Sequence, residues 1–356
     1  MSFKKILTVI IPAYNMEKYL DKTLSSLLIN EKILNSIEVL IINDGSKDNT
    51  SKIAHNYSNK YPEVFLAIDK ENGNYGSCVN AGLKIANGEF VKILDADDFF
   101  VTNGFEEYVN NLIKIKEDNI CVDMVVTNTQ VVDELGCITF NYTYELELNK
   151  NLIISIEDID ISILKKLTHH SVTYKTDMLK YMNYMQMEKV SYTDQEWISL
   201  PLFNVYKVIY FPICVYSYLV GREGQSMEAS RLINNAKIRL DIKKHMLKFY
   251  EENKDNYRDI NKRIVQDIIV SLIEPLYSEY LVEYRKSLNP LEIKKFDDFL
   301  RDNYVEFYSI LGSLYYKSIP IKYINLYRNH KSKLLYNFIL SLFDVALKAK
   351  RNIKKK

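Results

Sequence analysis

Short runs of apolar residues alternate with segments of helical spacing in the first part of the chain. The apolar runs lie at residues 7–11, 37–42, 64–68 and 90–94. Apolar residues three and four positions apart predict helices at residues 16–29, 48–61 and 76–86. Strands that are apolar at every position are buried on both faces, as in a parallel sheet covered by helices on each side. The pattern therefore predicts an α/β, Rossmann-like fold with a mostly parallel central sheet and flanking helices.

The pattern changes twice further along the chain. Mixed segments predict strands at residues 124–128, 138–144, 171–174 and 205–211, and a helix that starts near Asp194. Beyond residue 230, apolar residues at helical spacing predict helices at 232–252, 259–285 and 295–315. We therefore expect a first domain at 1–228 and an α-helical C-terminal region at 229–356.

The last segment, residues 331–356, has an apolar stripe at helical spacing followed by a cluster of lysines and one arginine. A basic amphipathic helix of this kind suits an anionic membrane surface. The alternative is a helix that packs on the body of the protein and ends in a frayed lysine tail. The sequence leaves both interpretations open.

Composition and charge exclude several classes of protein. The formal net charge is +1 in 356 residues, so no overall electrostatic attraction predicts nucleic-acid binding. The four cysteines are scattered without metal-ligand spacing, which favours a reducing compartment over a disulfide framework or a zinc site. No apolar run approaches the length of a membrane span or of a signal-peptide core. We expect a cytoplasmic protein, with a peripheral position on the inner face of the cell membrane as a further expectation.

Three carboxylates follow the apolar run at residues 90–94. Asp95, Asp97 and Asp98 lie within four positions and would repel one another unless a cation sat between them. Ligands of open α/β sheets bind at the carboxyl ends of the strands. Mg²⁺ and Mn²⁺ prefer oxygen ligands and often bind one or two carboxylates plus substrate phosphates. The segment thus predicts a divalent-metal site, and a solvated acidic turn that caps the next helix is the alternative.

Three sequence segments in their order and spacing, VIIPAYNMEKYL, VLIINDGSKDNT and ENGNYGSCVNAGLKIANGEFVKILDADD, carry a resemblance to a known family. They resemble family 2 glycosyltransferases with the GT-A fold, which are nucleotide-sugar-dependent and generally inverting. The resemblance covers about residues 5–225. It implies that 1–228 is a catalytic domain that binds a nucleotide-sugar donor.

The resemblance also implies roles for individual residues. Asp44 would read the uracil or ribose. Asp95 would contact the ribose or a metal-bound water and, with Asp97, form the site of the divalent metal, Mn²⁺ or Mg²⁺. Asp98 would be a helix-start or supporting residue. The implied nucleotide-sugar-binding residues are Pro12, Ala13, Tyr14, Asn15, Asp44, Asn72, Gly73, Asn80, Asp95, Ala96, Arg222 and Ser226. Relatives often have an Arg-Asn pair where this chain has Val79-Asn80, so one phosphate or ribose contact is in doubt.

An inverting transfer needs a base that deprotonates the acceptor hydroxyl. The resemblance places this carboxylate at the start of a helix, which matches Asp194, with Glu196 as the alternative. A simple helix cap at Asp194 is compatible with this role. Trp197 would wall the acceptor site or lie in the core.

The paired histidines His169 and His170 invite a metal interpretation. No further ligand is spaced in the sequence to join them, so we expect structural or acceptor-side histidines.

The sequence therefore predicts a metal-dependent inverting hexosyl- or N-acetylhexosaminyltransferase. The donor would be a UDP-sugar, and the acceptor a saccharide or lipid-linked molecule in the biosynthesis of a cell-surface polysaccharide such as a capsule. Two alternatives are another nucleotide-sugar-dependent transferase and a degenerate scaffold protein. A dehydrogenase would need GxGxxG after the first strand, which PAYNME is not. The carboxylates Asp44, Asp95, Asp97 and Asp194 argue against the scaffold.

Overall fold

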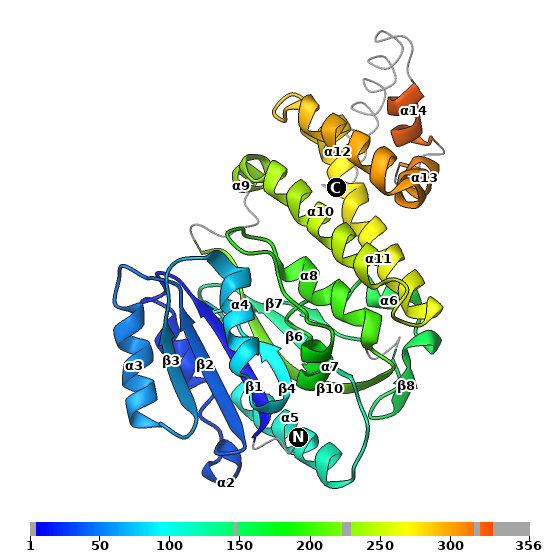
Figure 1. Cartoon of the computed structure of the whole chain (residues 1–356). Helices are drawn as coiled ribbons and strands as arrows, with labels where there is room; N and C mark the ends of the chain where they lie inside the picture. The colour runs from blue at the N-terminus through cyan, green and yellow to red at the C-terminus, as the bar shows by residue number, and fades with distance from the viewer. Residues whose placement is uncertain (1–4, 145–147, 223–228, 317–320, 330–356) are drawn as a thin grey trace. The chain divides into compact units, whose positions relative to one another are not determined.

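The computed structural model describes residues 5–144, 148–222, 229–316 and 321–329 (Figure 1). The chain divides into two compact units, one made of residues up to 225 together with 249–265, and the other of 226–248 and the residues from 266 onward. The amphipathic helix predicted at 331–356 lies outside the described residues.

A ten-stranded sheet forms the centre of the first unit, in the order β3-β2-β1-β4-β9-β6-β10-β5, with β7 and β8 paired to β6 and β10. The first four strands are parallel neighbours: β1 (Lys5–Ala13), β2 (Ile37–Asn43), β3 (Phe65–Asp69) and β4 (Gly88–Ile93). They coincide with the four apolar runs of the sequence. The predicted α/β class is confirmed.

The second half of the sheet is mixed. Its strands are β5 (Phe99–Phe100), β6 (Met124–Val132), β7 (Ile138–Tyr142), β8 (Ile153–Ser155), β9 (Val172–Lys175) and β10 (Lys207–Leu219). Strand β9 is antiparallel to both β4 and β6, whereas β6 and β10 are parallel. The long strand β10 therefore runs in the same direction as β4, and the hydroxyl of its Tyr216 and the N–H of its Leu219 donate to Asp98 in the acidic segment, residues 95–98.

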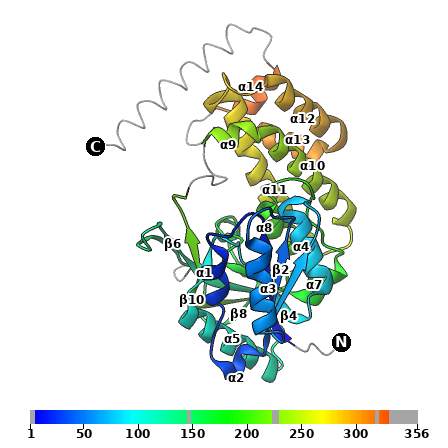
Figure 2. The same ribbon diagram turned by 90° about the vertical axis from the view of Figure 1, so that its left-hand side faces the viewer.

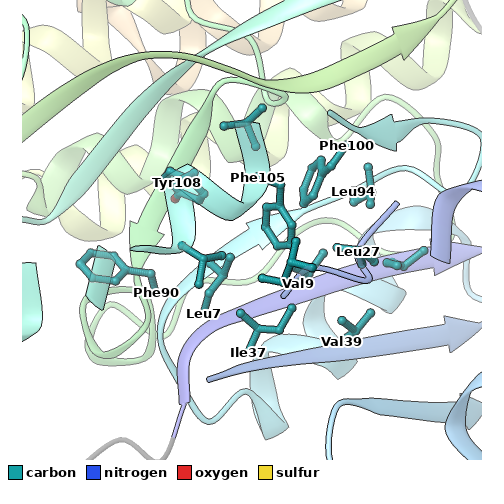
Figure 3. Close-up of a cluster of buried hydrophobic side chains, with 14 of the residues drawn as sticks. Leu7, Val9, Leu27, Ile37, Val39, Phe90, Leu94, Phe100, Phe105 and Tyr108 are labelled. Atoms are coloured by element: carbon teal, nitrogen blue, oxygen red, sulfur yellow. The ribbon is translucent and has the colours of Figure 1, made fainter. Parts of the chain in front are cut away.

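Helices cover both faces of the parallel half. On one face, α1 (Leu20–Ser25) and α5 (Thr102–Glu117) pack on apolar side chains of β1, β2 and β4, among them Leu7, Val9, Ile37, Val39 and Phe90 (Figure 3). On the other face, α4 (Asn74–Ile85) lies so close to β1 that a Cβ at Gly82 would be 2.7 Å from the Ile10 side chain. Helix α3 (Thr50–Lys60) runs beside β3 and β2 (Figure 1, Figure 2). Burial on both faces accounts for strands without polar alternation.

The helix predicted at residues 16–29 is shorter in the structure. Helix α1 ends at Ser25, and a separate turn of helix, α2 (Glu31–Leu34), follows. The hydroxyls of Ser25 and Ser26 donate to the carbonyls of Lys22 and Thr23, at 3.1 and 2.6 Å. Serine hydroxyls that bond to nearby backbone groups compete with the regular helix, which explains the early end.

Short helices and the returning segment 249–265 complete the first unit. The short helices are α6 (Ile161–Leu164), α7 (Thr176–Tyr181) and α8 (Asp194–Ser199), with 3₁₀ turns at Ile156–Asp158 and Leu200–Asn204. In the returning segment, Tyr250 and Tyr257 pack on Phe203, with ring centroids 5.5 and 5.6 Å apart. The buried amide of Asn261 donates to the carbonyls of Leu202 and Val205, both at 2.7 Å.

The second unit is helical, as the sequence predicts for the C-terminal region. Its elements include α9 (Ala229–Asn234), parts of α10 (Ala236–Asn253) and α11 (Asp259–Ser278), a π-helical turn at Glu279–Glu283, α12 (Pro290–Asn303), α13 (Val305–Ser313) and α14 (Tyr323–Asn329). Arg328 bonds to Asp297 at 2.7 Å, and Tyr277 donates to the same carboxylate at 2.5 Å.

In the part of the chain that the structure describes, every helix is too short or too polar to cross a membrane.

Candidate active site

The turns that follow β1 and β2 are tied together by Asn15. Its main-chain N–H donates to the Ser46 hydroxyl at 3.0 Å, and its side-chain oxygen accepts from the Lys47 N–H at 2.8 Å. Asn15 has a φ of 54°, a left-handed conformation that asparagine tolerates better than most residues. Of the predicted donor-binding residues before it, Pro12 and Ala13 are buried and Tyr14 is exposed. Pro12 and Ala13 are the last residues of β1, and Tyr14 and Asn15 follow them, so all four lie at the carboxyl end of this strand.

Asp44 holds the loop that follows β3. Its two carboxylate oxygens accept from Lys70 Nζ at 2.6 Å and from the main-chain N–H groups of Gly73 and Asn74 at 2.9 and 2.8 Å. The side chain of Asn72 closes the same loop by donating to the Asp44 carbonyl at 3.0 Å. Asp44 therefore shapes the loop, and its predicted contact with uracil or ribose stays a prediction. Lys70 is a partner that the sequence analysis missed, because nothing in its local pattern links it to Asp44.

Replacing Asp44 with alanine is expected to lower the free energy of unfolding by about 3–5 kcal/mol, since it leaves Lys70 and two N–H groups without their acceptor. Urea unfolding would measure the change. Asp118→Ala is the control: Asp118 is an exposed carboxylate at the end of α5. Surface substitutions of that kind usually change the free energy of unfolding by at most about 0.5 kcal/mol. Equal losses in the two variants would contradict the structural role of Asp44.

The start of α4 is packed against a segment near residue 187. A Cβ at Gly76 would lie 2.2 Å from the Met187 carbonyl oxygen, so only glycine permits this approach. Asn80 accepts from the Gln186 N–H at 2.8 Å and donates to the Glu188 side chain at 3.0 Å. Asn80, predicted to bind the donor, thus joins α4 to the segment that leads to Asp194.

The three carboxylates after β4 lie close together. One oxygen from each of Asp95, Asp97 and Asp98 falls within 4.8 Å of the others. Asp98 is buried and accepts from the Tyr216 hydroxyl at 2.7 Å and from the Leu219 N–H at 2.8 Å. Its supporting position agrees with the role that the family resemblance implies. Asp95 and Asp97 are less buried.

Thr23 of α1 fixes the turn of the acidic segment. Its hydroxyl lies 2.9 Å from the Ala96 carbonyl oxygen and 2.6 Å from that of Asp98. Ala96, predicted to line the donor site, is itself buried. The backbone of the segment is therefore held from one side while the carboxylates of Asp95 and Asp97 extend from it.

Positive groups of the chain balance two of the three carboxylates. Arg222 pairs with Asp97, and its guanidinium lies over the Tyr19 ring at 5.5 Å. Burial and the charge of Asp95 raise the pKa of Asp97, and Arg222 opposes that rise. Ser226, predicted to bind the donor together with Arg222, lies outside the described residues.

Asp95 accepts from the Tyr75 hydroxyl at 2.7 Å and lies 3.2 Å from His169 Nε2. Burial works against the ionised carboxylate, but the charge and hydrogen bond of His169 prevail and hold the pKa of Asp95 at about 2. Burial likewise lowers the pKa of His169, and the charge of Asp95 outweighs it, so that this pKa is raised. The pair is thus an ionised carboxylate beside an imidazole that gains a proton readily.

His170 lies in the same cluster. Its ring is 3.8 Å from the ring of His169 and packs on Tyr216 and Tyr218 at 4.5 and 4.6 Å. Burial and the charge of His169 keep the pKa of His170 well below its usual value. Asp95 lies beside the histidine pair: one atom from each of Asp95, His169 and His170 lies within 4.8 Å of the others. Asp95 is 74 residues before His169, so sequence spacing could not reveal this contact.

The predicted base, Asp194, is the first residue of α8 and is half-buried. After burial and Asp95, its charge contributes to raising the pKa of Tyr75 well above the usual value, and the Tyr75 hydroxyl donates to Asp95. Glu196, the alternative base, is fully buried and accepts from the Met187 N–H at 2.8 Å. This burial favours Asp194.

Trp197 lies in the core. It is fully buried and packs edge-on against Tyr174 and Tyr184, with ring centroids 5.2 and 5.9 Å away. Of the two interpretations that the sequence left open, the structure therefore supports the core position over the wall of an acceptor site.

Lys92 is a fully buried lysine of β4, three residues before Asp95. The sequence analysis missed it, although a lysine within an apolar run is visible in the sequence. Its Nζ donates to the His170 carbonyl at 2.6 Å and lies 3.3 Å from the Val172 carbonyl oxygen. Burial lowers the pKa of Lys92 from 10.5 to about 7. Two carbonyls satisfy its hydrogen bonds without compensating its charge.

Lys92 is expected to make stability depend on pH. Between about pH 7 and 10.5 the unfolded chain keeps the Lys92 proton and the folded protein releases it. The free energy of unfolding, relative to a Lys92→Met variant, should therefore rise with pH by up to about 1.4 kcal/mol per pH unit above pH 7 and stay flat below it. Urea unfolding of both proteins from pH 6 to 9 would measure the difference, and a constant difference over that range would contradict the prediction.

Comparisons with known proteins identify similar glycosyltransferases. The model of glycosyl transferase family 2 matches residues 8–166. An uncharacterised glycosyltransferase of Mycoplasma pneumoniae is 43% identical over 108 residues, which are 30% of this chain and 36% of that protein. The minor teichoic acid biosynthesis protein GgaB of Bacillus subtilis is 28% identical over 315 residues, 84% of this chain and 32% of that protein. These matches span about a third of the length of the two relatives.

A solved structure shows the same fold. The crystal structure of S. aureus TarS 1-349 in complex with UDP-GlcNAc is 20% identical, with a TM-score of 0.60, and the match covers 83% of this chain and 80% of that one. The likeness extends over the curled mixed sheet and its flanking helices.

Proposed function

Because the chain belongs to glycosyltransferase family 2, we propose that it is an inverting glycosyltransferase that moves a hexosyl or N-acetylhexosaminyl group from a UDP-sugar to a saccharide or lipid-linked acceptor. One observation carries the proposal. The loop held by Asp44 and the carboxylates Asp95 and Asp97 follow the carboxyl ends of parallel strands, and the charge of Asp194 acts on Tyr75, which donates to Asp95. These are the three parts that the reaction requires: donor binding, charge stabilisation and a base.

The carboxylates fit a divalent cation. Asp95 and Asp97 offer oxygen atoms within 4.8 Å of each other, which is the ligand chemistry that Mg²⁺ and Mn²⁺ prefer. When bound, such a cation stabilises the negative charge that develops on the diphosphate leaving group. Arg222, which pairs with Asp97, would supply a further positive charge to the same diphosphate.

Asp194 would remove the proton from the acceptor hydroxyl. The hydroxyl oxygen attacks the anomeric carbon from the side opposite the leaving diphosphate, which inverts the configuration there, and the proton passes to the Asp194 carboxylate.

The donor and acceptor classes are inferred from relatives. S. aureus TarS binds UDP-GlcNAc, which makes UDP the first nucleotide to test. The name of GgaB assigns it to minor teichoic acid biosynthesis, which supports a cell-surface polymer as the product. The predicted cytoplasmic position at the inner face of the membrane is part of the same proposal.

Thermal unfolding with UDP, GDP, dTDP and CMP, each with and without Mn²⁺, tests the proposed function. A ligand at a hundredfold excess over its Kd stabilises the folded state by about 2.7 kcal/mol. We expect UDP with Mn²⁺ to give the largest rise in melting temperature. No rise with any nucleotide would contradict the proposal and favour the scaffold alternative.

A further inference from the structure

Two imidazole rings lie beside the carboxylates of the acidic segment. Asp95, His169 and His170 offer one oxygen and two ring nitrogens, all within 4.8 Å of one another. The Asp95 oxygen and His169 Nε2 are 3.2 Å apart. Two ligands at about 2.1 Å from a cation, at right angles to each other, are separated by about 3 Å. This pair of atoms is therefore already at the spacing of adjacent metal ligands.

His170 has ring nitrogens for which the protein supplies no partner. Its side chain is 6% exposed, and neither Nδ1 nor Nε2 has a hydrogen-bond partner among the described residues. The nearest carboxylate, that of Asp98, is 3.9 Å from Nε2. Leaving a buried polar atom without a partner costs about 1–3 kcal/mol. The ring is held in this position by Tyr216 and Tyr218, which stack on it.

We propose that Asp95, His169 and His170 form a mixed oxygen–nitrogen site for a divalent transition cation. Asp95 belongs both to this group and to the all-carboxylate group with Asp97 and Asp98, so its carboxylate is the common ligand. The site deepens the proposed function, because it assigns nitrogen ligands to the metal that the transfer would use. The His169–Asp95 hydrogen bond gives way to two bonds to the cation, and the proton that made it is released to solvent.

The ligand set determines which metal binds. Imidazole nitrogens prefer transition cations, whereas carboxylate and water ligands suit Mg²⁺, Ca²⁺ and Mn²⁺ alike. A site with two imidazoles is therefore expected to bind Mn²⁺ at least about tenfold more tightly than Mg²⁺. A site made of Asp95, Asp97 and Asp98 alone would show little of this preference.

Mn²⁺ binding to the full chain, without nucleotide, tests the proposal. Electron paramagnetic resonance measures the free Mn²⁺ during a titration, and electron spin echo modulation detects ¹⁴N bonded to the ion. We expect ¹⁴N coupling in the wild-type protein. We expect its loss or reduction, with at least about tenfold weaker Mn²⁺ binding, in His170→Phe, which keeps the ring that packs on Tyr216 and Tyr218.

His169→Gln is a second variant of the cluster, and it decides the test if His170→Phe does not fold. His55→Gln is the matched control. His55 is an exposed histidine that bonds to Asp69 at 2.7 Å outside the cluster, so its loss should leave Mn²⁺ binding unchanged. Absence of Mn²⁺ binding or of ¹⁴N coupling in the wild-type protein would overturn the proposal, as would wild-type affinity in both cluster variants.

The result of this metal-binding test is independent of the result of the nucleotide-binding test of the proposed function. Stabilisation by UDP without ¹⁴N coupling would overturn the nitrogen ligands and leave the transferase intact. Coupling to ¹⁴N without any nucleotide binding would support the metal site and contradict the transferase.

Discussion

Replacing Asp97 with asparagine is expected to reduce sugar transfer by about a hundred- to a thousandfold and to abolish the part of the UDP stabilisation that needs metal. Asparagine keeps the size of the side chain and removes the charge that a divalent cation requires. Loss of one electrostatic contact to the developing charge typically lowers kcat by about that factor. Burial and Asp95 raise the pKa of Asp97, so the wild-type site already holds this charge at a cost that a cation would offset.

Initial rates with a UDP-sugar and thermal shifts with UDP and Mn²⁺ would measure both effects. Asp118→Asn is the control, because Asp118 is an exposed carboxylate at the end of α5 and is expected to leave both quantities unchanged. If Asp97→Asn kept the full metal-dependent shift with UDP, Asp97 would not be a metal ligand.

Replacing Asp194 with asparagine is expected to slow transfer by about a hundred- to ten-thousandfold while UDP and Mn²⁺ still stabilise the protein. A positioned base contributes a factor of this size to the chemical step, and donor binding does not depend on it. The separation of the two readouts distinguishes a base from a residue that shapes the donor site. Loss of nucleotide binding together with activity would contradict the assignment.

Glu196→Gln is the matched comparison two residues further along α8. Glu196 is fully buried and accepts from the Met187 N–H, so the variant should change the free energy of unfolding by about 1–3 kcal/mol and leave the chemical step of the folded enzyme nearly intact. The reverse result, with transfer lost in Glu196→Gln and kept in Asp194→Asn, would make Glu196 the base.

The parallel half of the sheet could be predicted because its strands carry their signal locally. β1, β2 and β4 are largely buried on both faces, so most of their positions are apolar, and the runs at 7–11, 37–42, 64–68 and 90–94 coincide with β1 to β4. The helix predicted at 16–29 was wrong in length, because apolar spacing does not report what the hydroxyls of Ser25 and Ser26 bind. Periodicity therefore identified buried faces better than element ends.

The site was predicted less completely, because its contacts join residues far apart in the chain. Asp95 and Asp97 are visible as carboxylates at a strand end, but the pairing of Asp95 with His169 depends on β9 lying beside β4.

A helix turns 100° per residue, so Asp194 and Glu196 face directions about 200° apart. That rotation makes one carboxylate half-exposed and the other buried, and the sequence alone does not say which.

The return of residues 249–265 to the first unit limits how the two units can be exchanged between genes. Helices α10 and α11 each contribute residues to both units, so the chain enters the second unit, comes back and leaves again. Recombination at a single junction after residue 225 would take Tyr250 and Tyr257 away from Phe203 and the amide of Asn261 away from its two carbonyls. A viable hybrid needs compatible residues in this returning segment, so the C-terminal helices and the catalytic sheet are expected to have diversified together.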